Sequence, residues 1–456
     1  MKKIVLIILS VFSLATFSAK GQGYFAFYEL RDVVPQAQIL QPAFIPTNSV
    51  SVSLPFLNFG TSVQADYKLE ELFSYNNQGQ LTVDFDLLRA SAQDDNHTNF
   101  DATTNLLNVG IKTRVGAFTL FGNTRATGNI IYGVELMEFL ANGNSNHIGK
   151  TLDLSGTKFV LNGINELGLG YANEFLDKKL TIGARVKMVQ GVVHGSIGDD
   201  FQGTLHTRES DYLWTIGVKN GNINTAGLDY FFNSQDYEST DFLNYALSNK
   251  NRSVGFDIGA KYQILPWLKA EVAVNDIGNL KWSESVRNYT TEDAVVEYLG
   301  VDLANLSEAD NIFRDSLGSK FDSRETQETF TTALGTRIYF TATGNITPND
   351  RFSLTYFKNN ALKGIPANYA LSYNHRFENF VVGAVGSYRR ANNEVNIGAS
   401  FASNIGPVQL YMALDNVLVA NKPEQYSKAD FRFGLNLMFG YEKWKQKDKI
   451  VDLDKL

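Results

Sequence analysis

Strict two-residue alternation constrains this chain more than any other feature of its sequence. From Val254 to Ile264 the even positions are apolar, whereas the odd positions carry glycine, charged or amide side chains. Successive side chains of a β-strand point to opposite faces, so this stretch predicts a strand with one apolar and one polar face. The same alternation recurs at 107–115, 180–188, 268–275 and 430–439.

Strands of this kind fit either a soluble β-sandwich or a membrane β-barrel. The segments are longer than the ~5–6 residues that are usual for sandwich strands. They also carry single charged side chains at mid-strand on the polar face, which a water-filled or ionically plugged lumen tolerates. We therefore predict an all-β fold, a closed antiparallel transmembrane β-barrel, with the sandwich as the alternative.

The alternating segments also set the expected number of wall strands. Two of them, 201–208 and 211–218, alternate most weakly, so we expect 14 strands, or 16 if both belong to the wall. The predicted strands are 49–56 (or 58–66), 105–115, 117–127, 159–175, 179–195, 201–208, 211–218, 252–264, 268–277, 330–342, 352–358, 368–377, 380–388, 394–402, 408–416 and 430–439.

Connections between these segments alternate in length. Short turns are expected at 115–117, 176–179, 265–267, 345–350, 378–379 and 404–407, and longer links at 128–158, 219–251, 279–329, 389–393 and 417–428. Outer-membrane barrels have short periplasmic turns and long external loops, so we assign the short turns to the periplasm. Trp267, Trp282 and Trp444 lie near strand ends, where membrane boundaries favour aromatic side chains.

The first residues resemble an export signal. Met1-Lys2-Lys3 precedes an apolar run that ends at Phe17, and the small residues Ala19 and Gly21 follow. This predicts a cleaved signal peptide at 1–21 and, with the barrel, a location in a bacterial outer membrane in contact with its lipid. The absence of cysteine suits a large barrel, and the net charge of -7 argues against nucleic acid as a partner.

Residues 22–48, at the start of the expected mature chain, do not alternate. Pro35, Pro42 and Pro46 argue against a strand there, so an irregular or helical segment is expected. It could fold into the lumen as a hatch or form a periplasmic arm, and the sequence leaves both open. The barrel is expected over 49–441, and a charged periplasmic tail over 442–456.

The long link 279–329 carries two patterns that are typical of helix starts. Thr290-x-x-Asp293 precedes 294–299, and Ser307-x-x-Asp310 precedes Ile312 and Phe313. A hydroxyl side chain with an acid three residues later can satisfy the free amides of a first helical turn. We therefore expect a helical external loop that caps the barrel mouth, docks a protein partner or packs only on itself. A partner could also bind at the periplasmic face.

No catalytic motif is apparent, and we expect neither an enzyme nor a cofactor. The five histidines are scattered, with no pair at metal-ligand spacing on a predicted helix, and the chain has no cysteine. The pair to inspect is His194 and His206, which flank one predicted external hairpin. One short motif occurs twice, at 273–277 and 413–417, where we interpret the Asn and Asp residues as turn formers.

The better functional candidates are charged side chains on the predicted lumen face. Basic groups outnumber acidic groups among them, which could favour anions or carboxylate head groups, or they could form ion pairs that stiffen the barrel. These candidates are Lys112, Arg114, Arg185, Lys187, Asp257, Lys261, Glu271, Arg337, Arg376 and Arg432.

Four segments together resemble an uncharacterised outer-membrane family of Bacteroidota. They are Gln41–Pro46 (QPAFIP), Ser49–Phe56 (SVSVSLPF), Ala273–Trp282 (AVNDIGNLKW) and Phe431–Glu442 (FRFGLNLMFGYE). That family is similar to long-chain fatty-acid transporter barrels and to barrel partners of type IX secretion and gliding, which typically have fourteen strands. The transporters begin with an Asn-Pro-Ala hatch motif, whereas this chain has Gln41-Pro42-Ala43.

Two functions are therefore expected from the sequence. The first is a passage for small, hydrophobic solutes, with 22–48 as a hatch, an apolar pocket in the lumen and an opening through the wall. The second is a non-conducting structural or secretion-associated barrel, with an occluded lumen and a protein partner. The link 279–329 and the charged tail favour the second, and 22–48 favours the first.

Overall fold

The computed structural model describes residues 24–440, except 72, 76–78, 80, 94, 144, 233–237, 292, 299–322, 361–366 and 390–393. The expected signal peptide (1–21) and charged tail (442–456) lie outside these residues, and both stay predictions. Within the described part of the chain, no helix is long and apolar enough to cross a membrane.

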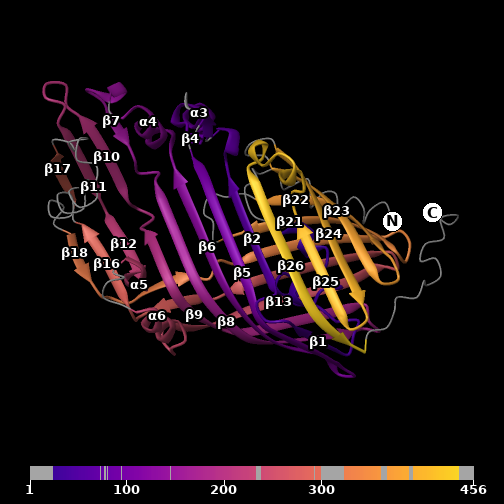
Figure 1. Cartoon of the computed structure of the whole chain (residues 1–456). Helices are drawn as coiled ribbons and strands as arrows, with labels where there is room; N and C mark the ends of the chain where they lie inside the picture. The colour runs from indigo at the N-terminus through magenta and orange to yellow at the C-terminus, as the bar shows by residue number, and fades with distance from the viewer. Residues whose placement is uncertain are drawn as a thin grey trace.

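Fourteen antiparallel strands close into a barrel, as the sequence predicts (Figure 1). Closure depends on β26, which pairs with β25 on one side and with β1 and β2 on the other. β1 and β2 share one wall position because both lie between β26 and β5. The wall consists of β1 (Val50–Ser53) with β2 (Asn58–Ala65), β5 (Asn96–Thr113), β6 (Gly116–Tyr132), β8 (Lys158–Phe175), β9 (Leu180–Ile197), β13 (Arg252–Leu265), β14 (Leu268–Ile277), β20 (Arg337–Asn345), β21 (Asp350–Asn359), β22 (Asn368–Arg376), β23 (Phe380–Arg389), β24 (Glu394–Ile405), β25 (Val408–Leu414) and β26 (Lys428–Phe439).

The alternation in sequence becomes an alternation between the two faces of the wall. In β13, Phe256 and Ile258 are about half exposed, whereas Asp257 between them is buried. Asp257 lies opposite Arg185 of β9, and residues directly opposite each other share a face. The polar face therefore points into the lumen and the apolar face points outward.

The wall ladder is interrupted between β1 and β2, at 54–57. Two backbone bonds remain there, from Leu54 N–H to the Leu435 carbonyl at 3.1 Å and from Phe56 N–H to the Asn105 carbonyl at 3.2 Å. The side chain of Asn58 adds two more, because its Nδ2 donates to the carbonyls of Leu54 at 3.0 Å and Leu435 at 2.9 Å. Hydrogen bonds therefore bridge the interruption. The two alternatives for the predicted first strand, 49–56 and 58–66, correspond to β1 and β2.

The two weakest predicted strands do not belong to the wall, so 14 strands are confirmed and 16 is wrong. They are β10 (Gln202–Thr207) and β11 (Trp214–Lys219), which form a separate four-stranded sheet with β7 (Thr151–Asp153) and β17 (Ala294–Tyr298). With six residues each, β10 and β11 are shorter than the ~9–11 residues that a spanning strand needs. This sheet projects beyond the long-loop end of the barrel (Figure 1).

The helix predicted at 294–299 is wrong, because these residues begin with strand β17. Val295 and Val296 are β-branched and favour a strand, and β17 pairs with β11 along its whole length. The Asp293 carboxylate accepts a bond from the backbone N–H of Asn220 instead of capping a helix. The second predicted helix, at 307–313, lies outside the described residues.

Long connections lie towards one end of the barrel and short turns towards the other, as predicted (Figure 1). The long-loop end carries the helices α3 (Phe85–Ser91), α4 (Val134–Asn142), α5 (Asp229–Phe232) and α6 (Ser239–Ala246), the 3-10 helices η2 (Leu69–Glu71), η3 (Ser145–His147), η5 (Leu418–Ala420) and η6 (Pro423–Gln425), and the strands β3 (Phe73–Tyr75), β4 (Leu81–Val83), β12 (Gly221–Ala226), β15 (Asn279–Trp282), β16 (Val286–Thr291), β18 (Ser323–Thr326) and β19 (Phe330–Ala333).

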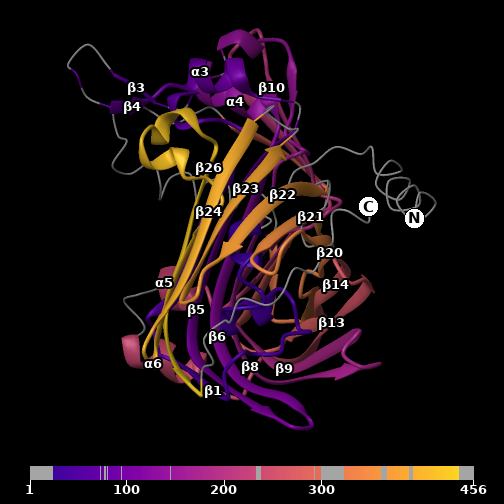
Figure 2. The same cartoon turned by 90° about the vertical axis from the view of Figure 1, so that its right-hand side faces the viewer.

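Residues 24–48 form a plug, and its first twenty-one residues lie inside the barrel. They include α2 (Phe25–Tyr28) and η1 (Pro35–Ile39), whose residues are all buried (Figure 2, indigo). Tyr28 stacks on Tyr339 of β20, with ring centroids 4.8 Å apart, and Phe27 stacks on Tyr411 of β25. The segment therefore packs against lumen-facing side chains and does not run outside the wall as an arm.

Two wall glycines let the plug approach the backbone of the wall. A Cβ on Gly183 of β9 would lie 2.1 Å from the Pro42 carbonyl oxygen. A Cβ on Gly259 of β13 would lie 2.2 Å from Gln41 Oε1 and 3.0 Å from the Ala43 nitrogen. These two glycines are register partners, so together they form a flat seat for the turn at 41–43.

We predict that Gly259→Val unseats this part of the plug. Overpacking a well-packed interior costs about 1–3 kcal/mol, so we expect a lower unfolding temperature and faster proteolysis within 24–48. Gly386→Ala on β23 is the matched control, because its Cβ would meet nothing closer than 3.9 Å. Equal protease protection of both variants would show that the plug does not need this seat.

Candidate functional site

Arg31 of the plug forms the centre of an ionic contact with the wall. Its Nε and Nη2 donate to the two carboxylate oxygens of Glu271 on β14, at 2.8 and 2.9 Å. Its Nη1 lies 3.1 Å from Glu29 of the plug itself. All three side chains are at most 2% exposed, so the paired geometry replaces the water that these charges lose.

A second set of ion pairs adjoins the first. Asp32 of the plug accepts bonds from Lys261 Nζ of β13 at 2.6 Å and from Arg351 Nη1 of β21 at 2.7 Å. Arg351 also contacts Glu29 at 3.3 Å. We call the six residues of both sets the latch; they carry three negative and three positive charges, and are Glu29, Arg31, Asp32, Lys261, Glu271 and Arg351.

The latch shifts the ionisation of its plug residues. Burial alone would raise the pKa of the Asp32 carboxyl, but Lys261, Lys269 and Arg351 outweigh it and hold that pKa well below its ordinary value. Burial likewise opposes the charge on Arg31, yet Glu271 and Glu29 raise its pKa well above the ordinary value. Both groups are therefore charged at neutral pH, and the plug is held by full ion pairs.

Backbone groups of the plug are held by the motif that occurs twice in the sequence. Asn275 donates from Nδ2 to the Leu40 carbonyl at 2.9 Å, and Asp415 accepts from the Ala26 N–H at 2.6 Å. Asn275 and Asp415 occupy corresponding positions of the two copies. The turn chemistry predicted for the motif is present, since Asn416 accepts from the Leu418 N–H at 3.1 Å, and both copies also bind the plug.

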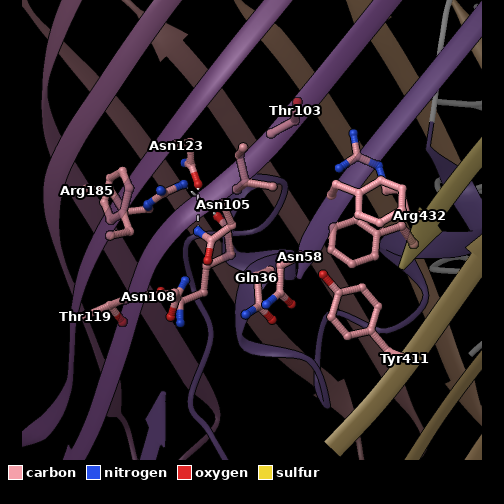
Figure 3. A pocket seen from close by; sticks show the side chains of 15 residues that line it. Gln36, Asn58, Thr103, Asn105, Asn108, Thr119, Asn123, Arg185, Tyr411 and Arg432 are labelled. Carbon is pink, nitrogen blue, oxygen red and sulfur yellow. Dashed lines mark hydrogen bonds between the residues drawn. The ribbon is translucent and has the colours of Figure 1, made fainter. Parts of the chain in front are cut away.

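A narrow crevice lies between the plug and the wall (Figure 3). Its volume is about 30 Å³, and it is lined by Phe27, Gln36, Gln38, Ile39, Asn58, Phe59, Thr103, Asn105, Asn108, Thr119, Phe121, Asn123, Arg185, Tyr411 and Arg432. A water molecule needs about 10–15 Å³ of such space, so the crevice accepts water and excludes solutes of metabolite size.

Two arginines beside the crevice rest on aromatic rings. Arg432 of β26 lies over the ring of Tyr24 in the plug at 4.0 Å and pairs with Asp101 at 3.7 Å. Arg185 of β9 lies over Phe121 at 3.6 Å, and its Nη1 donates to the Gln38 carbonyl of the plug at 3.2 Å. Cation–π contacts of desolvated groups add to the packing that fixes the plug.

A seven-residue ionic cluster lies in the lumen beside the plug. Asp276 is its centre, accepting from Arg125 at 3.0 Å, from Arg337 at 2.7 Å and from Lys187. Its backbone has a positive φ of 61°, a conformation that Asp tolerates better than most residues. The cluster consists of Arg125, Glu166, Arg185, Lys187, Asp257, Asp276 and Arg337, all at most 6% exposed.

Beyond the cluster, at the long-loop end, the lumen widens into a vestibule of about 550 Å³. Arg125, Asp276 and Arg337 of the cluster line it, together with residues of β5, β8, β9, β12 and β19. Eleven of its lining residues are Asn or Asp, so this space is not the apolar pocket expected for a hydrophobic solute. Its volume is in the range of about 300–1,000 Å³ that is usual for small-molecule sites.

The structure places the ten predicted lumen charges in two groups. The first group is buried in the latch, in the ionic cluster or beside the crevice: Arg185, Lys187, Asp257, Lys261, Glu271, Arg337 and Arg432. The second group lies at the short-turn end: Lys112 and Arg114 are exposed, and Arg376 is half-buried at the end of β22. Strand ends explain this second group, because the lumen face there is open to solvent.

Several ionic residues were missed from the sequence. Arg125, Glu166 and Asp276 lie on wall strands, and the position of Arg125 on the polar face of β6 was a usable signal. The plug residues Glu29, Arg31 and Asp32 lie in a segment without strand alternation, so no face could be assigned to them.

Two predictions about single residues are wrong. Trp282 does not mark a membrane boundary, because it is fully buried and stacks on Phe330 of β19. His194 and His206 do not form a pair, since His194 lies on wall strand β9 and His206 on β10 of the separate sheet. Each has other polar neighbours: His206 contacts Thr151 at 3.1 Å.

Comparison with known families gives one match, to a family of unknown function (DUF5723), over residues 42–415. This chain belongs to that family. The resemblance seen in the sequence is thereby confirmed, whereas the Bacteroidota origin stays a prediction. A comparison of this chain with curated proteins gives no match.

A comparison with solved structures gives matches at low identity and with TM-scores under 0.5. The Ralstonia pickettii toluene transporter TbuX is 11% identical, with a TM-score of 0.42 over 94% of this chain and 100% of its own. A Pseudomonas aeruginosa FadL homologue is 9% identical, with a TM-score of 0.41 over 91% of this chain and 96% of its own. A mutant of the TodX monoaromatic hydrocarbon channel is 9% identical, with a TM-score of 0.38 over 93% and 96%.

We predict that Glu271→Gln weakens plug docking, because it leaves Arg31 buried without its wall acid. Breaking one member of a buried ion pair costs about 3–5 kcal/mol. Thermal unfolding and protease protection of 24–48 measure the loss. The double variant Arg31→Met/Glu271→Leu should lose less thermal stability and protease protection than Glu271→Gln, since it leaves no buried charge from this pair. A larger loss in the double variant would contradict the desolvation argument.

We predict that acid releases the plug through Asp32. Its pKa is lower in the folded protein, so its stabilisation is full above the ordinary aspartate pKa of about 3.9 and falls as pH drops through the folded value. The protection factors of plug amides, which are corrected for the intrinsic pH dependence of exchange, should be constant from pH 7 to 5 and fall below about pH 4. In Asp32→Asn, exchange should already be faster at pH 7 and should change less with acid; an unchanged acid response would exclude Asp32.

Proposed function

We propose that this protein is an outer-membrane barrel that passes small solutes through a lumen gated by its N-terminal plug. The observation that carries the proposal is the difference in size along the lumen. The vestibule at the long-loop end has a volume of about 550 Å³, whereas the crevice beside the plug has a volume of about 30 Å³. A solute can enter the first space, and it can continue only if the plug moves.

The outer face of the wall supports the membrane location. Large apolar side chains are exposed there on neighbouring strands, among them Phe118, Leu120, Leu167, Leu169, Ile182, Val186, Val254, Phe256, Ile258, Phe340, Leu371, Val395 and Ile397. Soluble proteins rarely expose a contiguous apolar surface of this extent, whereas a transmembrane barrel presents it to lipid.

The plug is suited to act as a gate because its polar contacts with the wall include ion pairs, which water can replace. Its latch is charge-balanced, so water entering the lumen can solvate each partner as the ion pairs separate. By contrast, the wall ladder of β26 with β1 and β2 is continuous on both sides of 54–57. Plug movement therefore does not require opening the wall.

The vestibule favours a solute that carries polar groups. A purely hydrophobic solute would leave buried amides and charges of the lining without hydrogen-bond partners, which costs free energy. The side chains of Phe100 and Phe330 add apolar surface to the same space. We therefore infer a small amphipathic solute, with passage from the long-loop side towards the short-turn end.

A second candidate is a non-conducting barrel that acts through a protein partner. The four-stranded sheet of β7, β10, β11 and β17 favours it, because this sheet projects beyond the wall and leaves Val295 73% exposed. In this case the plug would close the lumen permanently.

Conductance in planar bilayers separates the two candidates. We expect the full chain to be mostly closed, a variant lacking 24–48 to conduct steadily, and Glu29→Gln/Asp32→Asn to open intermittently, because only its latch is weakened. Arg208→Gln is the matched control, since it removes a cation from an exposed ion pair with Glu297 outside the lumen. Each variant is first checked for the folded barrel by its heat-dependent gel mobility.

A folded deletion variant without conductance would exclude the gated passage. Liposome swelling with neutral sugars then provides an independent test of the same point. Silence in both assays, together with specific capture of one protein by the β10–β11 sheet, would support the second candidate.

A further inference from the structure

Three polar side chains of the vestibule are connected in a chain of hydrogen bonds. His194 Nε2 lies 2.9 Å from Ser196 Oγ, and His194 Nδ1 lies 2.8 Å from Asn162 Oδ1. All three residues line the vestibule. A hydroxyl, an imidazole and an amide in this order are the arrangement by which proteins activate a serine: nucleophile, base and a group that orients the base.

The strand geometry explains why these residues meet. His194 and Ser196 are two positions apart on β9, so their side chains point to the same face. Asn162 lies directly opposite His194 on the neighbouring strand β8. His194 is 1% exposed, and its imidazole packs against the rings of Trp282 at 5.1 Å and Phe330 at 5.2 Å, which fixes its orientation.

The partners of His194 also decide which nitrogen carries the proton. The Oδ1 atom of Asn162 can only accept a hydrogen bond, so Nδ1 of His194 must donate. In the neutral ring Nε2 is then the acceptor, and it can receive the proton of the Ser196 hydroxyl. This is the tautomer that a general base needs.

Ser196 is accessible and has a possible oxyanion donor beside it. Its side chain is half-buried and faces the vestibule. Asn224 of β12 is its register partner, so the two side chains share a face about 5 Å apart at Cβ. A carboxamide N–H at that distance can stabilise negative charge on a carbonyl oxygen attached to Ser196.

We propose that Ser196, His194 and Asn162 form a hydrolytic site for small carboxylic esters. Ser196 Oγ attacks the ester carbonyl carbon as its proton passes to His194 Nε2, and Asn224 donates to the oxyanion. His194 then returns this proton to the departing alkoxide as the C–O bond breaks, which leaves an acyl-serine and an alcohol. Water attacks the acyl-serine, giving its proton to His194, and a carboxylic acid leaves as Ser196 regains its proton.

This site goes beyond the proposed passage and does not depend on it. Ser196 lies on the vestibule side of the ionic cluster, so an ester reaches it from the long-loop end while the plug stays in place. The activity also differs from the expectation that the chain is not an enzyme. That expectation rested on the absence of a sequence motif, whereas Asn162 joins the other two residues only through strand pairing.

Covalent labelling tests the nucleophile first. The full chain in detergent is treated with a fluorophosphonate probe, and peptide mass spectrometry locates the adduct; we expect it on Ser196. Hydrolysis of p-nitrophenyl acetate should fall at least about a hundredfold in Ser196→Ala, to the rate in buffer. Ser62→Ala is the matched control, since it removes a buried lumen-facing hydroxyl of β2 that has no hydrogen-bond partner among the described residues.

The two other residues have different expected effects. His194→Gln should abolish both labelling and hydrolysis. If this variant misfolds, the comparison of hydrolysis by the full chain and by Ser196→Ala still decides the proposal. Asn162 is a positioning residue, so Asn162→Ala should lower kcat with little change in KM. Asn162→Asp should restore kcat and move the acid limb of the pH profile to higher pH, because a carboxylate holds the imidazole proton more tightly; a purely structural role would not move that limb.

Two results would overturn the proposal: no adduct on Ser196 in the folded protein, or equal hydrolysis by the full chain and by Ser196→Ala. Neither result concerns the passage, which is measured by conductance. Conversely, a protein that is silent in bilayers and still hydrolyses the ester would retain this site and lose the gated lumen.

Discussion

A guanidinium buried in the lumen cannot be left without its acid, and the rest of this structure depends on that constraint. Arg31 has no exposed side-chain surface, and moving one unpaired ion into such an environment costs several kcal/mol even after relaxation. The pairing of Arg31 with Glu271 therefore positions the plug along the barrel axis. The aromatic stacks of Tyr28 and Phe27 and the glycine seat at Gly183 and Gly259 follow from that position.

Much of the fold could be predicted from local sequence. The alternation predicted the wall strands and their outward face, and the lengths of the connections predicted which strand ends lie together. Each of these signals is contained within about ten neighbouring residues. The prediction failed where a local pattern had two solutions. Thr290-x-x-Asp293 fits a helix start, yet Val295 and Val296 had a partner strand available in β11, and strand pairing supplied the backbone bonds that a helix would have supplied.

The functional residues were harder to predict because they are assembled by register. Alternation predicts that Arg185 and Asp257 face the lumen, but it does not predict that the pairing of β9 with β13 places them opposite each other. Asp276 accepts from residues on three different strands, and a single sequence contains no signal for that. Similarly, the separation of Asn162 from His194 has no meaning until β8 and β9 are paired.

The division of the latch between plug and wall has an electrical consequence. The plug contributes Glu29, Arg31 and Asp32, so its share of the latch is net negative by one charge. The wall share is Lys261, Glu271 and Arg351, net positive by one, and the ionic cluster adds four bases against three acids. While the plug is seated, the latch is neutral; once the plug leaves, the wall share of the latch carries one net positive charge. In the passage that we propose, plug movement leaves Lys261 and Arg351 on the wall without Asp32, the acid that both bind, so an anionic group of a solute can take its place.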